Sequence, residues 1–297
     1  MKKVLILGGT RYLGKAIVNQ LSLNSKFVIA SLSRSNEKNT INHFVCDRKK
    51  PEDLNKVFKE FSPNIIIDMV NFDREDSKNI AALYRNNSLP YLSHYIMIST
   101  FLVYNYFDYT AFSEKNINEN YNNEKVDEYT NRKIESELAL YPSSIMDITT
   151  ILRLPFVFSA DDYTKRFQAV CKISLRASLS DSYNKHCYSL IQKNDAANAI
   201  ISLLDLTPIG IADISNIGCV TDKKIIEILS EKVSIEKNSN NSLNEKFPYI
   251  VKQDICLASK KLIIKVPISL AIKKEGEKYF SSFNESEIVK NNEGYIV

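Results

Sequence analysis

The sequence predicts an α/β fold with a parallel sheet that carries helices on both faces. Over the first half of the chain, short apolar runs alternate with longer amphipathic stretches, which is the pattern of repeated strand–helix units. One of the runs, Ile65–Val70, is nearly all apolar, as expected of a strand buried on both faces. A glycine-containing turn joins the first apolar run to the first amphipathic stretch. At 297 residues, the chain is long enough for one large domain with a smaller partner lobe.

Each element of the first half follows from its spacing. Strands are expected at short apolar runs, and helices where apolar residues recur three or four positions apart. Pro51 favours a helix that begins there, because proline fits the first helical turn. In chain order we expect a strand at Val4–Leu7, a helix at Lys15–Leu23, a strand at Phe27–Leu32, a helix at Glu52–Phe61, a strand at Ile65–Val70, a helix at Asp76–Asn86 and a strand at Tyr95–Ser99.

The second half has weaker signals. Asp195 is expected to cap a helix, since a carboxylate at that position accepts from the first free N–H groups. In chain order we expect a polar loop at Tyr104–Glu128, a helix at Tyr129–Leu140, a strand at Ile148–Leu152, an exposed loop at Ser180–Lys185, helices at Asp195–Leu204 and Lys223–Lys232, and a polar linker at Ser234–Glu245. The last forty or so residues carry weak helical signals.

Composition excludes several classes of function. The net charge of +4 and the pI near 8.6 are too mild to imply nucleic-acid binding. No stretch approaches the roughly 20 apolar residues that a membrane span requires. The opening MKKVLILGG meets glycine after a short apolar run, which favours a buried strand over a secretory leader. None of the five cysteines forms a CxxC pair, so we expect no metal site, and an odd cysteine count fits a reducing cytoplasmic location.

The turn from Leu7 to Gly14 has the features of a phosphate-binding loop. Gly8 permits a tight turn, and Gly14 lets the following helix pack closely on the strand. The N-terminus of that helix offers N–H groups and a positive dipole end to a pyrophosphate. Thr10, Arg11, Tyr12 and Leu13 complete the predicted cofactor turn. The alternative is a plain strand–helix turn that binds nothing.

Two positions bear on the type of dinucleotide. NAD-binding folds usually hold the adenosine ribose with an acid at the end of the second strand, whereas here that strand ends in Ser33 and is followed by Arg34. Arg11 stands where the middle glycine is usual. Two guanidinium groups near the ribose favour a 2′-phosphate and hence NADP(H), unless both are simply solvated. Asp47 is placed to accept from the adenine amino group, and a helix-capping or turn role is the equal alternative.

A tyrosine and a lysine one turn apart form the predicted reacting centre. Tyr129 and Lys133 share one helix face, and an ammonium near a phenol stabilises the phenolate. The phenol can then exchange the proton that accompanies hydride transfer to a carbonyl. Tyr121 and Lys125 have the same spacing but lie in an asparagine-rich loop. We favour Tyr129 because it leads into a helix with an apolar stripe, and rigid elements position catalytic groups better.

A hydroxyl at the end of a buried strand supplies the third group. Ser99 and Thr100 close the strand before Phe101, at the edge where parallel sheets bind ligands. Thr100 is the candidate to hydrogen-bond the reacting oxygen alongside Tyr129. The alternative is a strand-end hydroxyl that satisfies the backbone.

Together, these motifs resemble those of the extended or atypical short-chain dehydrogenases/reductases, also called the NAD-dependent epimerase/dehydratase family. The similarity runs from Met1 to about Leu229, and the ordered set is more specific than any one motif. The motifs that carry it are GGTRYLG at 8–14, Cys46–Asp47, Ser99-Thr100-Phe-Leu-Val-Tyr104, Tyr129 and Lys133, Leu152-Arg153-Leu-Pro155, Asn194-Asp195-Ala-Ala and Ser215-Asn216-Ile-Gly218.

The resemblance implies a Rossmann-type doubly wound sheet with a small C-terminal substrate lobe. Residues 1–158, with 186–218 returning to them, would form the dinucleotide-binding domain, and residues 159–185 and 219–297 the substrate lobe. Arg48, Val70, Ser99 and Pro155 would join the cofactor residues, with Lys133 on the nicotinamide ribose. A substrate diphosphate needs cations from the second lobe, for which Lys165 and Arg166 are the candidates. Family members often dimerise through the helix that carries the YxxxK motif, so a homodimer is expected.

The implied activity is that of a cytoplasmic NADP- or NAD-dependent reductase or epimerase acting on a nucleotide sugar. Dehydratases of the family carry an Asp-Glu pair where this chain has Phe101-Leu102, so elimination of water is not expected. A reductase is favoured over an epimerase because the sequence favours NADP(H), whereas epimerases recycle a bound NAD. One alternative is a non-catalytic relative that binds RNA or senses redox state, and another is a reductase of a small non-nucleotide carbonyl compound.

Overall fold

The computed structural model describes residues 1–36, 41–106, 126–176, 185–231, 249, 254, 255, 257, 264 and 266–282. The chain divides into two compact units. The described residues of the first unit lie in Met1–Leu154 and Ala196–Ile214, and those of the second in Pro155–Asp195, Ser215–Ala258 and Ile264–Val297. The sequence-based boundary grouped 186–218 with the first unit, whereas residues up to Asp195 and from Ser215 cluster with the second.

The first unit is a seven-stranded, wholly parallel sheet in the order β3-β2-β1-β4-β5-β6-β9, which confirms the predicted Rossmann-type fold. The chain passes outward from β1 on one side and then returns to start β4 on the other, so the strand order reverses between β1 and β4. Ligands of such sheets bind beyond the carboxyl ends of the strands at this reversal. Its strands are β1 (Lys2–Leu7), β2 (Phe27–Ser33), β3 (Asn42–Val45), β4 (Ile65–Asp68), β5 (His94–Thr100), β6 (Thr149–Leu154) and β9 (Gly210–Asp213).

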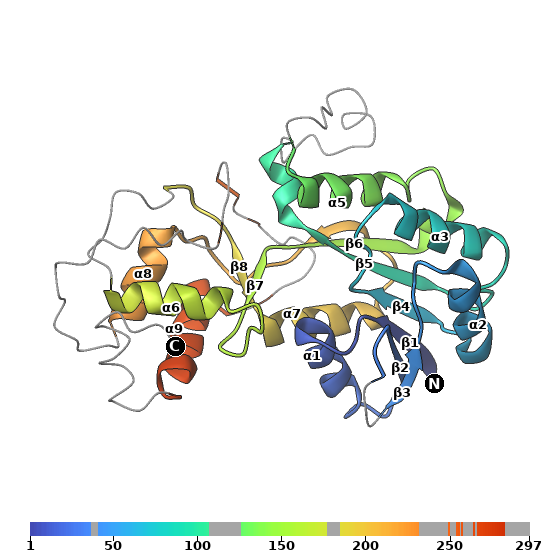
Figure 1. Cartoon of the computed structure of the whole chain (residues 1–297), viewed down its shortest axis with the longest axis horizontal. Coiled ribbons are helices and arrows are strands. Elements are labelled where there is room, and N and C mark those ends of the chain that lie inside the picture. Colours follow the sequence, from blue (N-terminus) through green and yellow to red (C-terminus); the bar gives the residue numbers. More distant parts are fainter. Residues whose placement is uncertain are drawn as a thin grey trace. The chain divides into compact units, whose positions relative to one another are not determined.

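Helices cover both faces of this sheet. Figure 1 shows α3 and α5 over one face and α1 and α7 over the other. The helical segments are α1 (Tyr12–Leu21), α2 (Pro51–Phe61), α3 (Arg74–Arg85), the 3₁₀ turn η1 (Phe101–Asn105), α5 (Glu128–Leu138), the 3₁₀ turn η3 (Ser144–Ile148), α7 (Lys193–Ser202) and the 3₁₀ turn η4 (Leu203–Asp205).

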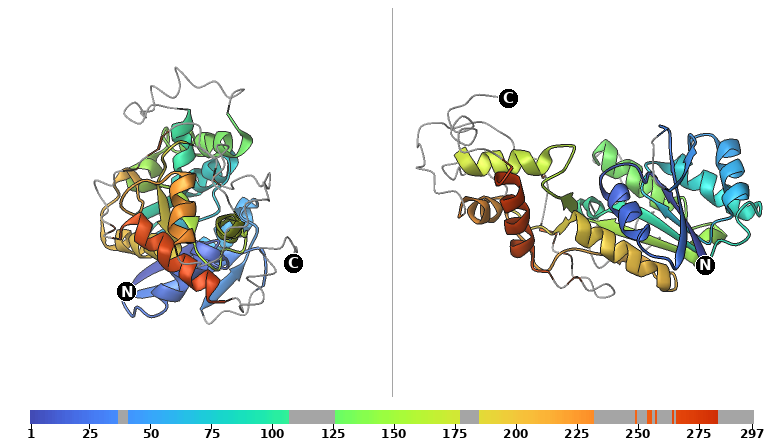
Figure 2. Two further views of the ribbon diagram at one scale, coloured as in Figure 1. Left: turned by 90° about the vertical axis from the view of Figure 1, so that its left-hand side faces the viewer. Right: turned by 90° about the horizontal axis from the view of Figure 1, so that it is seen from below.

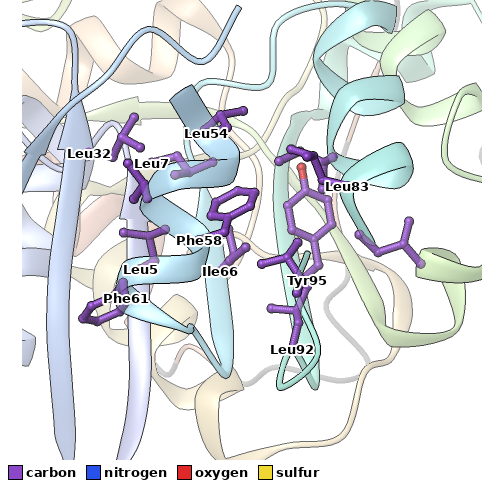
Figure 3. Packing of buried hydrophobic residues seen from close by; sticks show 14 of the residues in the cluster. Leu5, Leu7, Leu32, Leu54, Phe58, Phe61, Ile66, Leu83, Leu92 and Tyr95 are labelled. Atoms are coloured by element: carbon purple, nitrogen blue, oxygen red, sulfur yellow. The ribbon is translucent and has the colours of Figure 1, made fainter. Parts of the chain in front are cut away.

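One large apolar core lies between the sheet and helices α2 and α3. Leu5, Leu7 and Ile66 of the central strands are fully buried there. Phe58 of α2 packs over these strands, and Tyr95 of β5 lies in the same cluster (Figure 3). Residues alternate along each strand, so every second side chain reaches this layer. This core makes the carboxyl edge of the sheet a rigid platform for the residues that follow each strand.

The second unit contains a two-stranded parallel sheet and three helices. The strands β7 (Phe156–Phe158) and β8 (Leu190–Gln192) pair in parallel. The helices are α6 (Arg166–Arg176), α8 (Asp222–Ser230) and α9 (Ile268–Phe280), and both α6 and α9 contact α8 (Figure 2). None of the described helices is both long and apolar enough to span a membrane.

Two expectations need correction. Helix α7 begins at Lys193, ahead of the predicted cap Asp195, because the Gln192 side chain accepts from the Asn194 and Asp195 N–H groups at 2.6 and 3.0 Å. Asp195 instead accepts from the Asn216 amide at 2.7 Å. Cys219 is disulfide-bonded, which differs from the expectation of reduced thiols, whereas Cys46, Cys171 and Cys187 are not in disulfides.

Candidate active site

The predicted phosphate turn has the close packing that its glycines imply. Gly8 has a φ of +86°, and a Cβ placed on it would lie 2.6 Å from Val70 Cγ1. A Cβ on Gly14 would lie 2.1 Å from the Gly8 carbonyl oxygen, so α1 can approach the turn only because residue 14 is glycine. The Gly8 N–H donates to Leu32 O at 2.8 Å, which fixes the turn against β2.

The N-terminus of α1 differs electrostatically from those of its neighbours. Arg11 precedes the helix without a capping side-chain hydrogen bond, and the first turn has no acidic residue. By contrast, Asp73 caps α3 and Asp127 caps α5, and both helices have acids in the first turn. The positive end of α1 is therefore not neutralised locally, as a pyrophosphate site requires. The turn and this helix end fit a dinucleotide.

The remaining residues of the turn have different exposures. Thr10 and Tyr12 are half-buried, Leu13 is buried, and Arg11 projects into solvent. Tyr12 has a φ of +42°, a positive value that the backbone of residues other than glycine rarely adopts. Contacts with Leu32 and Val70 thus hold the backbone of the turn in place, while the guanidinium of Arg11 is exposed to solvent and accessible to a ligand.

The end of β2 lies beside a histidine that sequence inspection missed. His43 of β3 is within 2.7 Å of Ser31 Oγ through Nδ1 and within 3.2 Å of Ser33 Oγ through Nε2. Ser33 also donates to Ser35 O at 2.9 Å. Arg34 is exposed beside this cluster. Among the residues described up to position 36, the end of β2 therefore presents hydroxyl, imidazole and guanidinium groups and no carboxylate.

Asp47 and Arg48, predicted to contact the cofactor, have separate roles in the turn after β3. The half-buried Asp47 accepts from the Lys49 N–H at 3.1 Å, which is the turn role considered above as its alternative. Arg48 is buried and points into the protein. Its guanidinium donates to Asp68 at 2.6 Å and lies 3.1 Å from an Asp76 carboxylate oxygen. These carboxylates raise the pKa of Arg48 against the opposing effect of burial.

Lys133 reaches across the carboxyl ends of two central strands. It is 3% exposed, and its Nζ donates to Asn71 O at 2.6 Å and to Ile98 O at 2.9 Å. The same nitrogen lies 5.1 Å from the centroid of the exposed Phe72 ring. Burial lowers the pKa of Lys133 to about 8, and the charges of Asp68 and Glu137 oppose that effect.

The other two predicted reacting groups lie on the elements that Lys133 joins. Tyr129 is in the first turn of α5, one turn before Lys133, and is 50% exposed. Thr100 ends β5, is buried, and its Oγ1 accepts from the Leu102 N–H at 3.3 Å. Lys133 bonds Ile98, two residues before Thr100, so the structure brings the lysine to the strand of the threonine. Tyr121 and Lys125 lie outside the described residues.

Ser99 and Pro155, the other predicted cofactor residues, are both buried. Ser99 Oγ donates to Glu137 of α5, so this hydroxyl is directed to the helix. Pro155 is the first residue of the second unit. In that unit, Lys165 is exposed with a φ of +58°, and Arg166 begins α6 with its Nε 2.9 Å from Thr164 Oγ1.

Sequence inspection missed a buried polar network around these groups. Asn71 follows β4, and its side chain bonds Ser77, Ser136 and Tyr95, while the Tyr95 hydroxyl donates to Asp68 at 2.8 Å. An acid ending an apolar strand, such as Asp68, was the available signal. Among the described residues, no group of three or more His, Cys, Asp or Glu side chains is placed to hold a metal ion.

Comparisons with known proteins support the resemblance. Residues 4–91 match the model of the NAD dependent epimerase/dehydratase family. No curated protein matches the sequence. Among solved structures, dTDP-glucose 4,6-dehydratase from Bacillus anthracis in complex with NAD superposes with a TM-score of 0.69 at 14% identity, covering 95% of this chain and 97% of that one.

Two further structures give the same result. The Bordetella bronchiseptica enzyme WbmH in complex with NAD⁺ has a TM-score of 0.69 at 15% identity, covering 95% of this chain and 99% of that one. UDP-glucose 4-epimerase from Thermotoga maritima with UDP-glucose has a TM-score of 0.68 at 14% identity, covering 94% and 99%. At these identities the superpositions establish the fold.

Proposed function

We propose that the protein is an NADP(H)- or NAD-dependent oxidoreductase of the sugar-nucleotide reductase or epimerase type. The reaction is hydride transfer at a carbonyl or hydroxyl carbon of the sugar, with Tyr129 as the acid/base. The resemblance and the matched family model support the reaction class. The reductase reaction is favoured by the NADP preference argued below.

The position of Lys133 carries this proposal. A buried ammonium held by the carbonyl groups of Asn71 and Ile98 sits where β4 and β5 end, beside the reversal of strand order. Desolvating an ammonium is unfavourable, so a purely structural lysine would be expected to reach solvent. One turn away on the same helix face stands Tyr129, half exposed toward solvent.

The chain's own groups divide the chemistry as follows. Tyr129 Oη gives a proton to, or takes one from, the substrate oxygen, while Lys133 holds positive charge near the phenol. Thr100 Oγ1 holds the same oxygen by a hydrogen bond. When bound, the nicotinamide supplies or accepts the hydride. Residues Gly8 to Gly14 would hold the pyrophosphate at the N-terminus of α1.

NADP(H) is the preferred cofactor because the end of β2 carries no acid. Arg11 and Arg34 are both exposed near the predicted adenosine ribose position, where a 2′-phosphate would need cations. Two of the three solved structures described above hold NAD, so NAD is retained as the alternative cofactor. A nucleotide-sugar substrate, diphosphate contacts from Lys165 and Arg166, and a homodimer stay predictions.

The test begins with thermal melts in the presence of NADPH, NADH and a panel of nucleotide sugars, because a ligand that binds the folded state raises the melting temperature. Pairs that do so are then assayed for NADPH oxidation, which a reductase drives stoichiometrically and an epimerase does not. Tyr129→Phe should lower kcat by about 10²- to 10⁴-fold. Tyr91→Phe, also an exposed tyrosine of the first unit, serves as the matched control and should be unaffected.

Full activity in Tyr129→Phe would refute the assigned acid/base. Absence of any cofactor effect, together with salt-sensitive RNA binding, would instead support the non-catalytic alternative.

A further inference from the structure

Glu137 of α5 is at the centre of a buried charge network next to the predicted reacting centre. It pairs with Arg153 of β6 at 2.5 Å between Oε2 and Nη2 and at 3.2 Å between Oε1 and Nε, and both side chains are 0% exposed. Arg153 also donates to the Tyr104 hydroxyl at 2.9 Å, which in turn donates to Asp213 at 2.9 Å. The network therefore joins α5 to the carboxyl ends of β6 and β9.

The same carboxylate contacts the strand that carries Thr100. Ser99 Oγ donates to Glu137 Oε1, and Ser99 directly precedes Thr100 at the end of β5. The backbone position of Thr100 is thus fixed from helix α5 as well as by the pairing of β5 with β6. Glu137 is also four residues after Lys133, so the two side chains share a face of α5.

Charged groups approach Lys133 from each of the surrounding elements. Asp68 faces it from β4, Asp76 from α3, Arg48 from the turn after β3, and Glu137 from its own helix. Tyr95 of β5 is the neighbouring titratable group and is hydrogen-bonded to Asp68. Two of the carboxylates, Asp68 and Asp76, are already paired with Arg48.

A buried ion pair is a weak source of stability, since the desolvation of both charges offsets their attraction. The pairing of Glu137 with Arg153 is therefore not explained by folding energy alone. Glu137 lies on α5, the helix of Lys133, and it contacts β5, the strand of Thr100, through Ser99.

We propose that Glu137 is a positioning residue of the reacting centre, which keeps Lys133 protonated and, through Ser99, fixes the end of β5 that carries Thr100. The proposal rests on the proposed function for its catalytic meaning. Its physical content, the effect of Glu137 on the charge of Lys133, can be measured without cofactor or substrate.

The experiment is an NMR titration of the full chain labelled with ¹³C-lysine, with Lys133→Met to assign the resonance. In the wild type, Lys133 should titrate near pH 8, well separated from exposed lysines at about 10.4. Glu137→Gln keeps a carbonyl oxygen for Ser99 but removes the charge, and should lower the Lys133 midpoint by about one unit. Glu135→Gln is the matched control, because Glu135 lies on the same helix but pairs with the exposed Arg74. It should leave the midpoint unchanged.

A second variant guards against misfolding. Glu137→Gln takes the carboxylate charge away from the buried guanidinium of Arg153, whereas Glu137→Gln/Arg153→Met removes both charges and is expected to fold. Loss of the like charge on Arg153 can by itself only raise the midpoint of Lys133. The double variant is therefore compared with Arg153→Met, which carries the effect of Arg153 alone: a lower Lys133 midpoint in the double variant than in Arg153→Met supports the proposal, and equal midpoints overturn it.

Turnover then separates this inference from the proposed function. In an active enzyme, the double variant should lose kcat with little change in the KM for cofactor, and the alkaline limb of its pH profile should move with the lysine midpoint. A titration that shifts as expected in a protein without cofactor turnover would refute the proposed function alone. An unshifted titration in an active enzyme would refute this inference alone.

Discussion

Gly14 offers the sharpest test of the phosphate turn, because its side-chain position is blocked by backbone. The Cβ introduced by Gly14→Ala would lie 2.1 Å from Gly8 O and 3.1 Å from Gly9 Cα. Backbone cannot rotate aside as a flexible side chain can, so α1 must move away from the turn or the turn must open. Overpacking of this kind costs about 3 kcal/mol. At about 2–4 °C per kcal/mol, the melting temperature should fall by roughly 6–12 °C.

Gly210→Ala is the matched control, since it separates steric from conformational cost. Gly210 has a φ of +68°, but a Cβ there meets nothing within 4 Å. The expected cost is therefore backbone strain alone, about 1 kcal/mol, or roughly 2–4 °C. Gly210 begins β9, at the opposite end of that strand from the ligand edge.

The assay is thermal denaturation of both variants with and without NADPH. Gly14→Ala should melt lower and also lose the cofactor-induced rise in melting temperature, because the displaced turn no longer presents its N–H groups. Gly210→Ala should keep that rise. A Gly14→Ala variant that melts within about 2 °C of wild type and responds normally to NADPH would refute the packing argument.

Three further predictions follow from buried or exposed charges. Lys133 has a folded-state pKa of about 8 against an ordinary value of 10.5, so between these pH values the unfolded chain binds more protons than the folded one. The unfolding free energy should therefore rise by roughly 3 kcal/mol as the pH increases from 8 to 10.5. Lys133→Met should abolish this rise in urea titrations. Burial, with the charge of Lys2, lowers the pKa of His94 to about 4, so the unfolding free energy should fall as pH drops from 6.5 to 4, and acid melts of His94→Gln should show a smaller loss. Arg34→Asp should weaken NADPH binding by about tenfold or more relative to NADH in fluorescence titrations, and equal loss for both would contradict a 2′-phosphate contact.

The central sheet could be predicted from sequence because its strands are buried on both faces. Ile65–Val70 and Tyr95–Ser99 are nearly all apolar, and they correspond to β4 and β5. Strand β3 was missed because Asn42–Val45 lies at the sheet edge and is only partly buried, so no apolar run marks it. Strands β7 and β8 are three residues each, too short for a periodic signal. Helix α6 was missed where the pattern loosens after Phe158.

In the candidate site, features set by neighbouring residues could be predicted from the sequence, whereas contacts between residues far apart in the chain could not. The shared face of Tyr129 and Lys133 follows from helical spacing alone. The partners of Lys133 do not, because Asn71 is 62 residues away and contributes only a backbone carbonyl. Arg48 was assigned to the cofactor, yet its guanidinium is bonded to Asp68, 20 residues on. Charges buried by long-range pairing look like surface charges in a sequence.

Tyr12 shows how stability and ligand recognition can oppose each other in this turn. An L-residue held at a φ of +42° costs about 1 kcal/mol that glycine would not. Tyr12→Gly should therefore relax the backbone, while removing an aromatic ring from within the predicted phosphate turn. A directed-evolution campaign that selects only for heat resistance would favour this exchange. It should be screened for retained dinucleotide affinity at every round.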